Sequence, residues 1–252
     1  MFIKAHDVRG LAALSMLLLS ACSSIAPVKE VTADQTGYMT KKFSPKSLSA
    51  NIEKKIPPTV DSTNFGQLKI TVEASNEQSD GKKQSYKNVM TLTDVGNGQV
   101  ERLIEQISND ISYNLVYALT YKGIVGLRWQ AVPLLGTRTT PLYEIRDVTR
   151  FDAIPSKANN EFVVEYTMGQ ESQMAGGITT QLACKSTRIF DAKELNEKLP
   201  GLATEFNCQQ LYNKAVQNHS KWVMLQKYGF AIMTEEITST QKTYFRVIDF
   251  NG

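Results

Sequence analysis

The 252-residue chain is poor in the residues that most often carry chemistry, with three cysteines and two histidines. The cysteines are Cys22, Cys184 and Cys208, and the histidines are His6 and His219. Zinc sites built on a cysteine pair usually include further cysteine or histidine at short spacing. None stands close to Cys184 or Cys208, so we expect no metal and no cofactor.

An excess of charge of one sign is also missing. The chain has 28 basic and 25 acidic residues, and no run of five or six like charges occurs. A nucleic-acid surface is expected to show a basic patch or stripe. The dispersed charge therefore argues against nucleic acid as a partner.

Motifs for catalysis are absent as well. No Gly-x-Ser-x-Gly sequence marks a nucleophile elbow, and Gly96-Asn97-Gly98 lacks the Gly-Lys-Ser/Thr of a phosphate loop. His219 has no evident partners for a role as general base. The Glu235-Glu236 pair is typical of solvated residues, and no spacing selects two carboxylates for glycoside hydrolysis. We predict that the protein is not an enzyme.

What the chain does have is a distinctive N-terminus. Lys4 and Arg9 precede or flank an apolar run, Leu11–Leu19, that ends in Leu19-Ser20-Ala21-Cys22. A charged start, an apolar middle and small residues at the end are typical of a secretory signal peptide. The apolar run is about nine residues, well below the roughly 20 that span a bilayer. An uncleaved anchor or a buried helix is the alternative interpretation.

The sequence Leu19-Ser20-Ala21-Cys22 resembles the lipobox of bacterial lipoproteins. The resemblance implies that residues 1–21 are removed and that Cys22 becomes the lipidated, palmitate-bearing first residue. Ser23, in place of Asp, is similar to the residue found in lipoproteins sent to the outer membrane. The implied location is the outer membrane, with lipid anchoring and a folded domain in the periplasm.

The region after the cysteine is predicted to be a tether. Residues 22–66 contain Pro27, Pro45 and the Pro57-Pro58 pair among many serine, threonine and lysine residues. Such a composition buries too little apolar surface to offset the entropy of ordering. We expect a lipid-anchored flexible tether over 22–66 and a globular domain over 67–252.

Periodicity in the globular domain predicts both strands and helices. Alternating apolar residues indicate strands near 67–74, 88–95, 124–135, 141–150, 230–237 and 243–250, and a long hairpin over 161–190. Apolar residues every three or four positions indicate long helices over 99–122 and 204–228. The predicted fold is α+β, a mainly antiparallel sheet packed against two long helices.

Cys184 and Cys208 remain as a pair once Cys22 is lipidated. Exported proteins fold in an oxidising compartment, which favours a disulfide between the two. Two unpaired buried thiols are the alternative.

Three functions fit these features. The first is a non-catalytic docking or assembly subunit of an envelope complex, such as secretion, pilus, flagellar or cell-wall machinery, with envelope proteins as partners. The second is an oligomeric pore-forming export lipoprotein that uses the 161–190 hairpin, whose arms of about ten residues suit a membrane strand. The third is a glycan- or small-ligand-binding lipoprotein, in which Tyr113, Tyr117 and Tyr121 could line a groove. A homo-oligomer is compatible with each.

Overall fold

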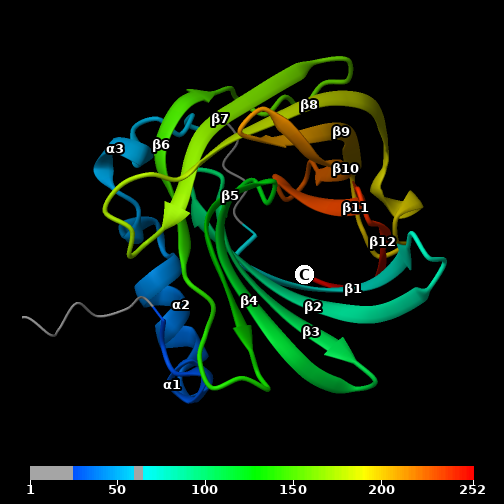
Figure 1. Cartoon of the computed structure of the whole chain (residues 1–252). Helices are drawn as coiled ribbons and strands as arrows, with labels where there is room; N and C mark the ends of the chain where they lie inside the picture. The colour runs from blue at the N-terminus through cyan, green and yellow to red at the C-terminus, as the bar shows by residue number, and fades with distance from the viewer. Residues whose placement is uncertain (1–24, 60–64) are drawn as a thin grey trace, which may run out of the picture.

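The structure, a computed structural model, describes residues 25–59 and 65–252. Twelve antiparallel strands in this part of the chain form a closed barrel (Figure 1). They are β1 Gln67–Gln78, β2 Lys83–Gly96, β3 Gln99–Ser108, β4 Ile111–Tyr121, β5 Val125–Pro133, β6 Tyr143–Phe151, β7 Glu161–Gln170, β8 Ile178–Asp191, β9 Leu202–Tyr212, β10 Ala215–Leu225, β11 Phe230–Thr238 and β12 Gln241–Asn251. The helices are α1 Val28–Ala33, α2 Gln35–Phe43, η1 Pro45–Ser47, α3 Ala50–Glu53 and η2 Ala192–Glu194.

Each strand pairs with its neighbours in sequence, and β1 pairs with β12 to close the wall. Two joints of this wall are short. β5 and β6 share only the pairs Arg128–Glu144 and Trp129–Tyr143, and β11 and β12 pair only over residues 235–237 of β11. The other joints in the described wall are each paired over seven or more positions.

The predicted α+β class is wrong, because both predicted long helices are β-hairpins. The segment 99–122 forms β3 and β4 around a turn in which Asn109 and Asp110 have positive φ. The segment 204–228 lies mostly in β9 and β10, which turn at Asn213 and Lys214, also with positive φ. Two-residue turns with both central residues at positive φ match the twist of a hairpin. These turns therefore favour hairpins in two segments where the spacing of apolar residues predicted helices.

The strand predictions elsewhere are confirmed. β7 and β8 form the hairpin predicted over 161–190 and pair in register from Glu161–Lys185 to Met168–Ile178. β1 begins at Gln67, the residue at which the globular domain was predicted to start. β1, β2, β5, β6, β11 and β12 each overlap a predicted strand.

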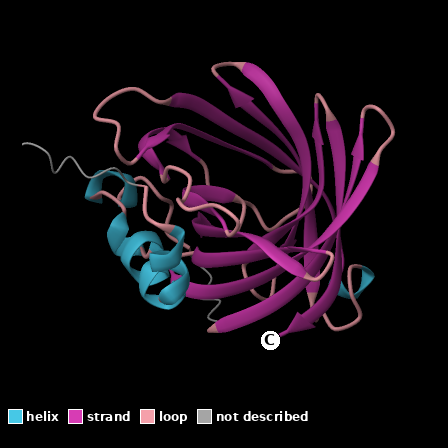
Figure 2. Ribbon diagram, turned by 60° about the horizontal axis from the view of Figure 1, so that its bottom comes forward, coloured by secondary structure: helices cyan, strands magenta, loops and turns pink. Residues whose placement is uncertain are grey.

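A short helical segment, α1 to α3, lies against the outer face of the barrel (Figure 2). Val31, Phe43 and Ile52 are buried in this contact. The ring of Tyr117, on the outer face of β4, stacks on Phe43 at 5.7 Å and meets Tyr38 edge-on at 5.4 Å. A flexible tether is therefore the wrong description of residues 28–56. The apolar residues are few, but the larger ones Val28, Val31, Phe43, Ile52 and Ile56 are all buried.

The barrel interior is packed at one end and hollow towards the other. At the packed end, Phe65 contacts Tyr228 and Phe230, and Phe250 contacts Tyr228. The turn between β4 and β5 also enters the interior there, because the backbone N–H of Ala231 on β11 donates to the Lys122 carbonyl at 2.8 Å. The opposite end, formed by the β1–β2, β3–β4, β5–β6, β7–β8, β9–β10 and β11–β12 connections, is called the open end below.

Candidate ligand-binding site

The larger interior cavity has a volume of about 370 Å³ and is open to solvent. Its lining is mainly aromatic and aliphatic and comes from β5 to β11, including Trp129, Tyr143, Tyr166, Met168, Ile178, Leu182, Tyr212, Trp222 and Met233. Trp129 and Tyr143 stack at 4.7 Å across the short β5–β6 joint. Cavities of this size, lined by apolar and aromatic side chains with a few polar groups, are typical of small-molecule sites.

A smaller cavity of about 240 Å³ adjoins it on the other side of Trp222 and Met233. Its apolar lining comes from β1, β2, β3, β11 and β12 and includes Val72, Met90, Leu92, Ile104, Phe230, Ile232 and Phe245. Trp222 is held in place by a 3.0 Å hydrogen bond from its Nε1 to the Ser220 hydroxyl. The two tryptophans of the chain therefore both border the interior.

Two chains of amide side chains lie in the interior towards the open end. Asn114 donates to Gln106 at 2.8 Å, and Gln106 donates to Asn88 at 3.3 Å. On the facing wall, Asn218 donates to the Gln210 side-chain oxygen at 3.2 Å and to the Glu236 carboxylate at 3.0 Å. Burial raises the pKa of Glu236. Burial, with the nearby charge of Glu236 contributing, raises the pKa of Tyr86 to about 12. The cavities are thus apolar inside and polar near their exit.

One cation, Arg102 on β3, lines the smaller cavity. Its guanidinium donates to the Gly123 carbonyl at 3.3 Å, while its Nε is shielded from solvent and has no hydrogen-bond partner in the described structure. Burial lowers the pKa of Arg102 to about 10, and no carboxylate of the described residues offsets this effect. The Arg102 side chain is therefore partly buried, and its guanidinium has unused hydrogen-bonding capacity.

Apolar side chains project from the loops of the open end. Leu135 in the β5–β6 loop is 86% exposed, and Met174 in the β7–β8 loop is fully exposed. Ile111, at the β3–β4 turn, is 62% exposed. The N-terminal segment meets the barrel at the same end, where Pro27 bridges to Arg138 of the β5–β6 loop.

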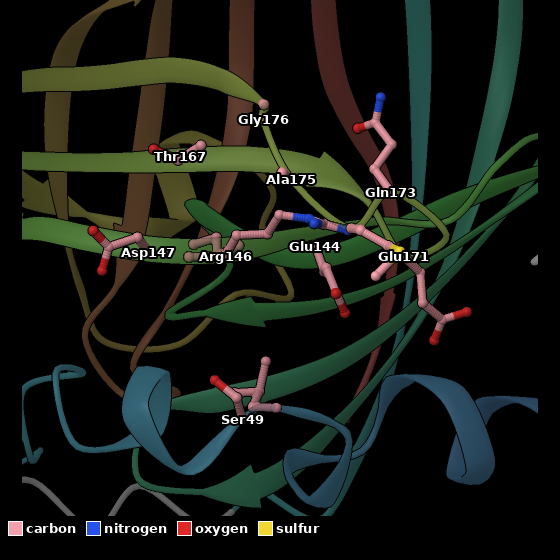
Figure 3. Close-up of a pocket in the computed structure, with 13 residues that line it drawn as sticks. Ser49, Glu144, Arg146, Asp147, Thr167, Glu171, Gln173, Ala175 and Gly176 are labelled. Carbon is pink, nitrogen blue, oxygen red and sulfur yellow. The ribbon is translucent and has the colours of Figure 1, made fainter.

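A third pocket, of about 680 Å³, lies outside the barrel between β6, the β7–β8 loop and the helical segment. Figure 3 shows Ser49 of the helical segment facing Glu144 and Arg146 of β6 across it. Its acids already have partners: Arg128 contacts Glu144 at 2.9 Å and Glu171 at 2.6 Å.

Further bonds join the helical segment to the same cluster. Lys42 pairs with Glu171 at 3.1 Å, and Arg128 donates to the Ser47 carbonyl at 2.5 Å. Burial opposes the effect, but Lys42 and Arg128 together hold the pKa of Glu171 below its ordinary value. We assign this outer pocket to the attachment of the helical segment, because its carboxylates Glu144, Asp147 and Glu171 all pair with basic residues.

The structure brings together one predicted pair of residues. Cys184 on β8 and Cys208 on β9 lie opposite each other and form a disulfide. Cys22, the predicted lipidation site, and the signal peptide lie outside the described residues. His219 is exposed on β10, and Tyr117 and Tyr121 are buried beneath the helical segment instead of lining a groove.

The pore-forming hairpin has no free arm. β7 pairs with β6 and β8, and β8 pairs with β7 and β9, so both arms belong to this chain's own barrel. Phe162 and Phe206 pack edge to face at 5.7 Å beside the disulfide strands. The apolar face of the hairpin is therefore used for the interior.

Sequence reasoning missed most of the lining of the cavities. Arg102 and Trp222 lie in the segments 99–122 and 204–228 that are predicted to be helices, and Glu236 lies in a pair that is predicted to be solvated. The described residues contain no group of three or more His, Cys, Asp or Glu side chains that could hold a metal. Within the same ranges, no helix combines the length and apolar character needed to cross a membrane.

No protein-family model and no curated protein matches the sequence. Among solved structures, the chain is similar to a crystal structure from Vibrio parahaemolyticus described as an outer membrane lipoprotein-sorting protein domain. The TM-score is 0.38 at 8% identity, and the match covers 75% of this chain and 87% of that chain.

Proposed function

We propose that the protein is a non-catalytic, lipid-anchored envelope protein of the outer membrane whose barrel binds an apolar or amphipathic small molecule. The observation that supports this most directly is the pair of adjoining cavities, about 370 and 240 Å³, bordered by Trp222 and Met233. Burying apolar ligand surface there would contribute roughly 0.8 kcal/mol for each methylene group. The anchor at Cys22 rests on the lipobox resemblance alone.

The two tryptophans provide a direct test, because Trp129 and Trp222 line the larger cavity. Residues 22–252 with Cys22→Ser keep every described residue and avoid acylation. A fatty alcohol brominated at mid-chain should quench tryptophan fluorescence in a saturable way, since bromine quenches on contact. Absence of saturable quenching by the brominated alcohol would refute the proposal.

Gly126 offers a way to block the larger cavity. It lines the cavity, and a Cβ built on it meets no atom within 4 Å. Gly126→Leu should therefore fold and fill the space, abolishing the quenching. Ala183→Leu is the matched control, because Ala183 lies between the inward residues Leu182 and Cys184 of β8 and faces outward. The control should bind as the parent does.

A docking or assembly role in an envelope complex is the second candidate function. The exposed apolar side chains Leu135 and Met174 at the open end favour it. Crosslinking in intact envelopes, followed by purification, should recover a partner protein that the double variant Leu135→Glu with Met174→Glu loses. Recovery of the same partner with that variant would count against docking at this end.

A further inference from the structure

We infer that the ligand of the barrel is an anionic amphiphile, a long-chain carboxylate, whose head group is bound by Arg102 inside the smaller cavity. This inference rests on the proposed function and specifies its ligand. The head would lie deep in the barrel and the chain would extend along the apolar lining towards the larger cavity and the open end.

Arg102 lacks an acidic partner among the described residues. A charge taken out of water is costly unless it is paired. Arg128, which is buried, meets this demand with Glu144 and Glu171, although its Nε also has no hydrogen-bond partner in the described structure. Arg102 has one hydrogen bond, to a neutral carbonyl, and a solvent-shielded Nε with no partner among the described residues. A ligand anion would supply the missing countercharge.

The cavity wall around Arg102 suits a carboxylate that is joined to an apolar chain. A guanidinium is a planar fork of donors that matches a carboxylate in two hydrogen bonds. Around Arg102 the cavity wall is aliphatic, with Met90, Leu92 and Ile104 on the neighbouring positions of β2 and β3. A carboxylate joined to an apolar chain satisfies both the charge and the apolar wall, whereas a compact hydrophilic anion satisfies only the charge.

Arg102 lies deeper in the barrel than Glu236, an acid that lines the same cavity. Arg102 follows the start of β3 at the packed end, whereas Glu236 precedes the end of β11 at the open end. Glu236 accepts a hydrogen bond from Asn218, and no ion pair joins it to Arg102. The cation is thus available to a ligand that reaches past the polar exit.

The test compares brominated fatty acid with the brominated fatty alcohol of the same chain length, at a pH at which the acid is ionised. Tryptophan quenching of residues 22–252 with Cys22→Ser gives both affinities. The parent should bind the acid more tightly than the alcohol. Arg102→Met should weaken acid binding by roughly tenfold to a hundredfold, the usual value of a hydrogen bond to a charged group, and leave alcohol binding unchanged.

The outcomes separate the two proposals. If neither probe binds the parent protein, the proposed function fails. If the alcohol binds but the acid binds no more tightly, or if Arg102→Met weakens both equally, the anion site is wrong and the apolar cavity stands. Should Arg102→Met not fold, the acid-over-alcohol preference of the parent decides, and Arg102→Lys should reduce that preference, since lysine keeps the charge but not the fork.

Discussion

The backbone N–H of Ala231 on β11 donates to the Lys122 carbonyl at 2.8 Å, although β4 and β11 belong to opposite walls of the barrel. This bond pulls the β4–β5 turn across the interior. Gly123 of the turn lines the smaller cavity, and Ile124 and Gly126 line the larger one. The turn therefore helps to divide the interior into two cavities.

Gly123→Ala should destabilise the barrel. Gly123 has φ +74°, and a Cβ there would lie 2.6 Å from the Ala231 carbonyl oxygen. The positive φ and the clash together predict a loss of roughly 2–3 kcal/mol in the free energy of unfolding, measured by urea denaturation. Gly126→Ala is the control, because its backbone and surroundings accept a Cβ. Equal free energies of unfolding for Gly123→Ala and Gly126→Ala would show that the barrel does not require a glycine at position 123.

Arg128→Met should weaken the attachment of the helical segment. Arg128 is only 5% exposed at its side chain and holds Glu144 and Glu171, so its removal leaves two acids without their shared cation. Breaking such a buried pair costs roughly 3–5 kcal/mol. We expect a loss of that order in urea unfolding and faster proteolysis within residues 28–56.

The matched control is Lys55→Met, which removes an exposed ion pair with Asp147 and a hydrogen bond to the Val148 carbonyl at 2.7 Å. Exposed pairs contribute about 0–1 kcal/mol. If Lys55→Met lowered the free energy of unfolding as much as Arg128→Met, the ion pairs of Arg128 would not be the main attachment of the helical segment.

Glu236→Gln should change the pH dependence of stability. Because burial raises the pKa of Glu236, the folded state retains a proton that the unfolded chain releases just above the ordinary glutamate pKa. The free energy of unfolding therefore falls as pH rises through this window. The glutamine variant should match the parent at acidic pH and be more stable at neutral pH.

Urea unfolding of the parent and the variant across this range measures the difference. Glu161→Gln, at an exposed position, serves as the control and should follow the parent at every pH. Parallel curves for the parent and Glu236→Gln would show that the carboxylate is not destabilised by burial.

Removing the disulfide should destabilise the protein without changing its fold. Cys184 and Cys208 are 24 residues apart, and a crosslink closing a loop of that size contributes roughly 3 kcal/mol. The double variant Cys184→Ala with Cys208→Ala should lose about that much in urea unfolding, as should the reduced parent. Two titratable thiols in the oxidised, denatured parent would contradict the bond.

Strands with a clear alternation could be predicted from the sequence, whereas β4, whose second half is buried on both faces, was mistaken for part of a helix. On β4, Tyr117, Leu119 and Tyr121 pack outward beneath the helical segment and are buried. Ala118 and Thr120, between them, are buried towards the interior. A strand covered on both faces loses its alternation and cannot be distinguished from a buried helix by periodicity.

The cavities could not be predicted because their lining is assembled by barrel closure. Arg102 and Glu236 come from strands far apart in the sequence, and they share a cavity only because β1 pairs with β12. Local periodicity carries no information on that closure. The disulfide could be predicted because it required only two cysteines and an oxidising compartment.

The first described residues of the chain bind to the β5–β6 loop at the open end. Val28 donates to the Thr137 carbonyl at 3.1 Å, and Thr139 donates to the Ala26 carbonyl at 3.0 Å. Pro27 follows Cys22 by five positions, so their Cα atoms can be at most roughly 18 Å apart. With lipid on Cys22, the exit of the cavities would be held close to the bilayer surface. A lipid could then pass between the membrane and the barrel over a short distance.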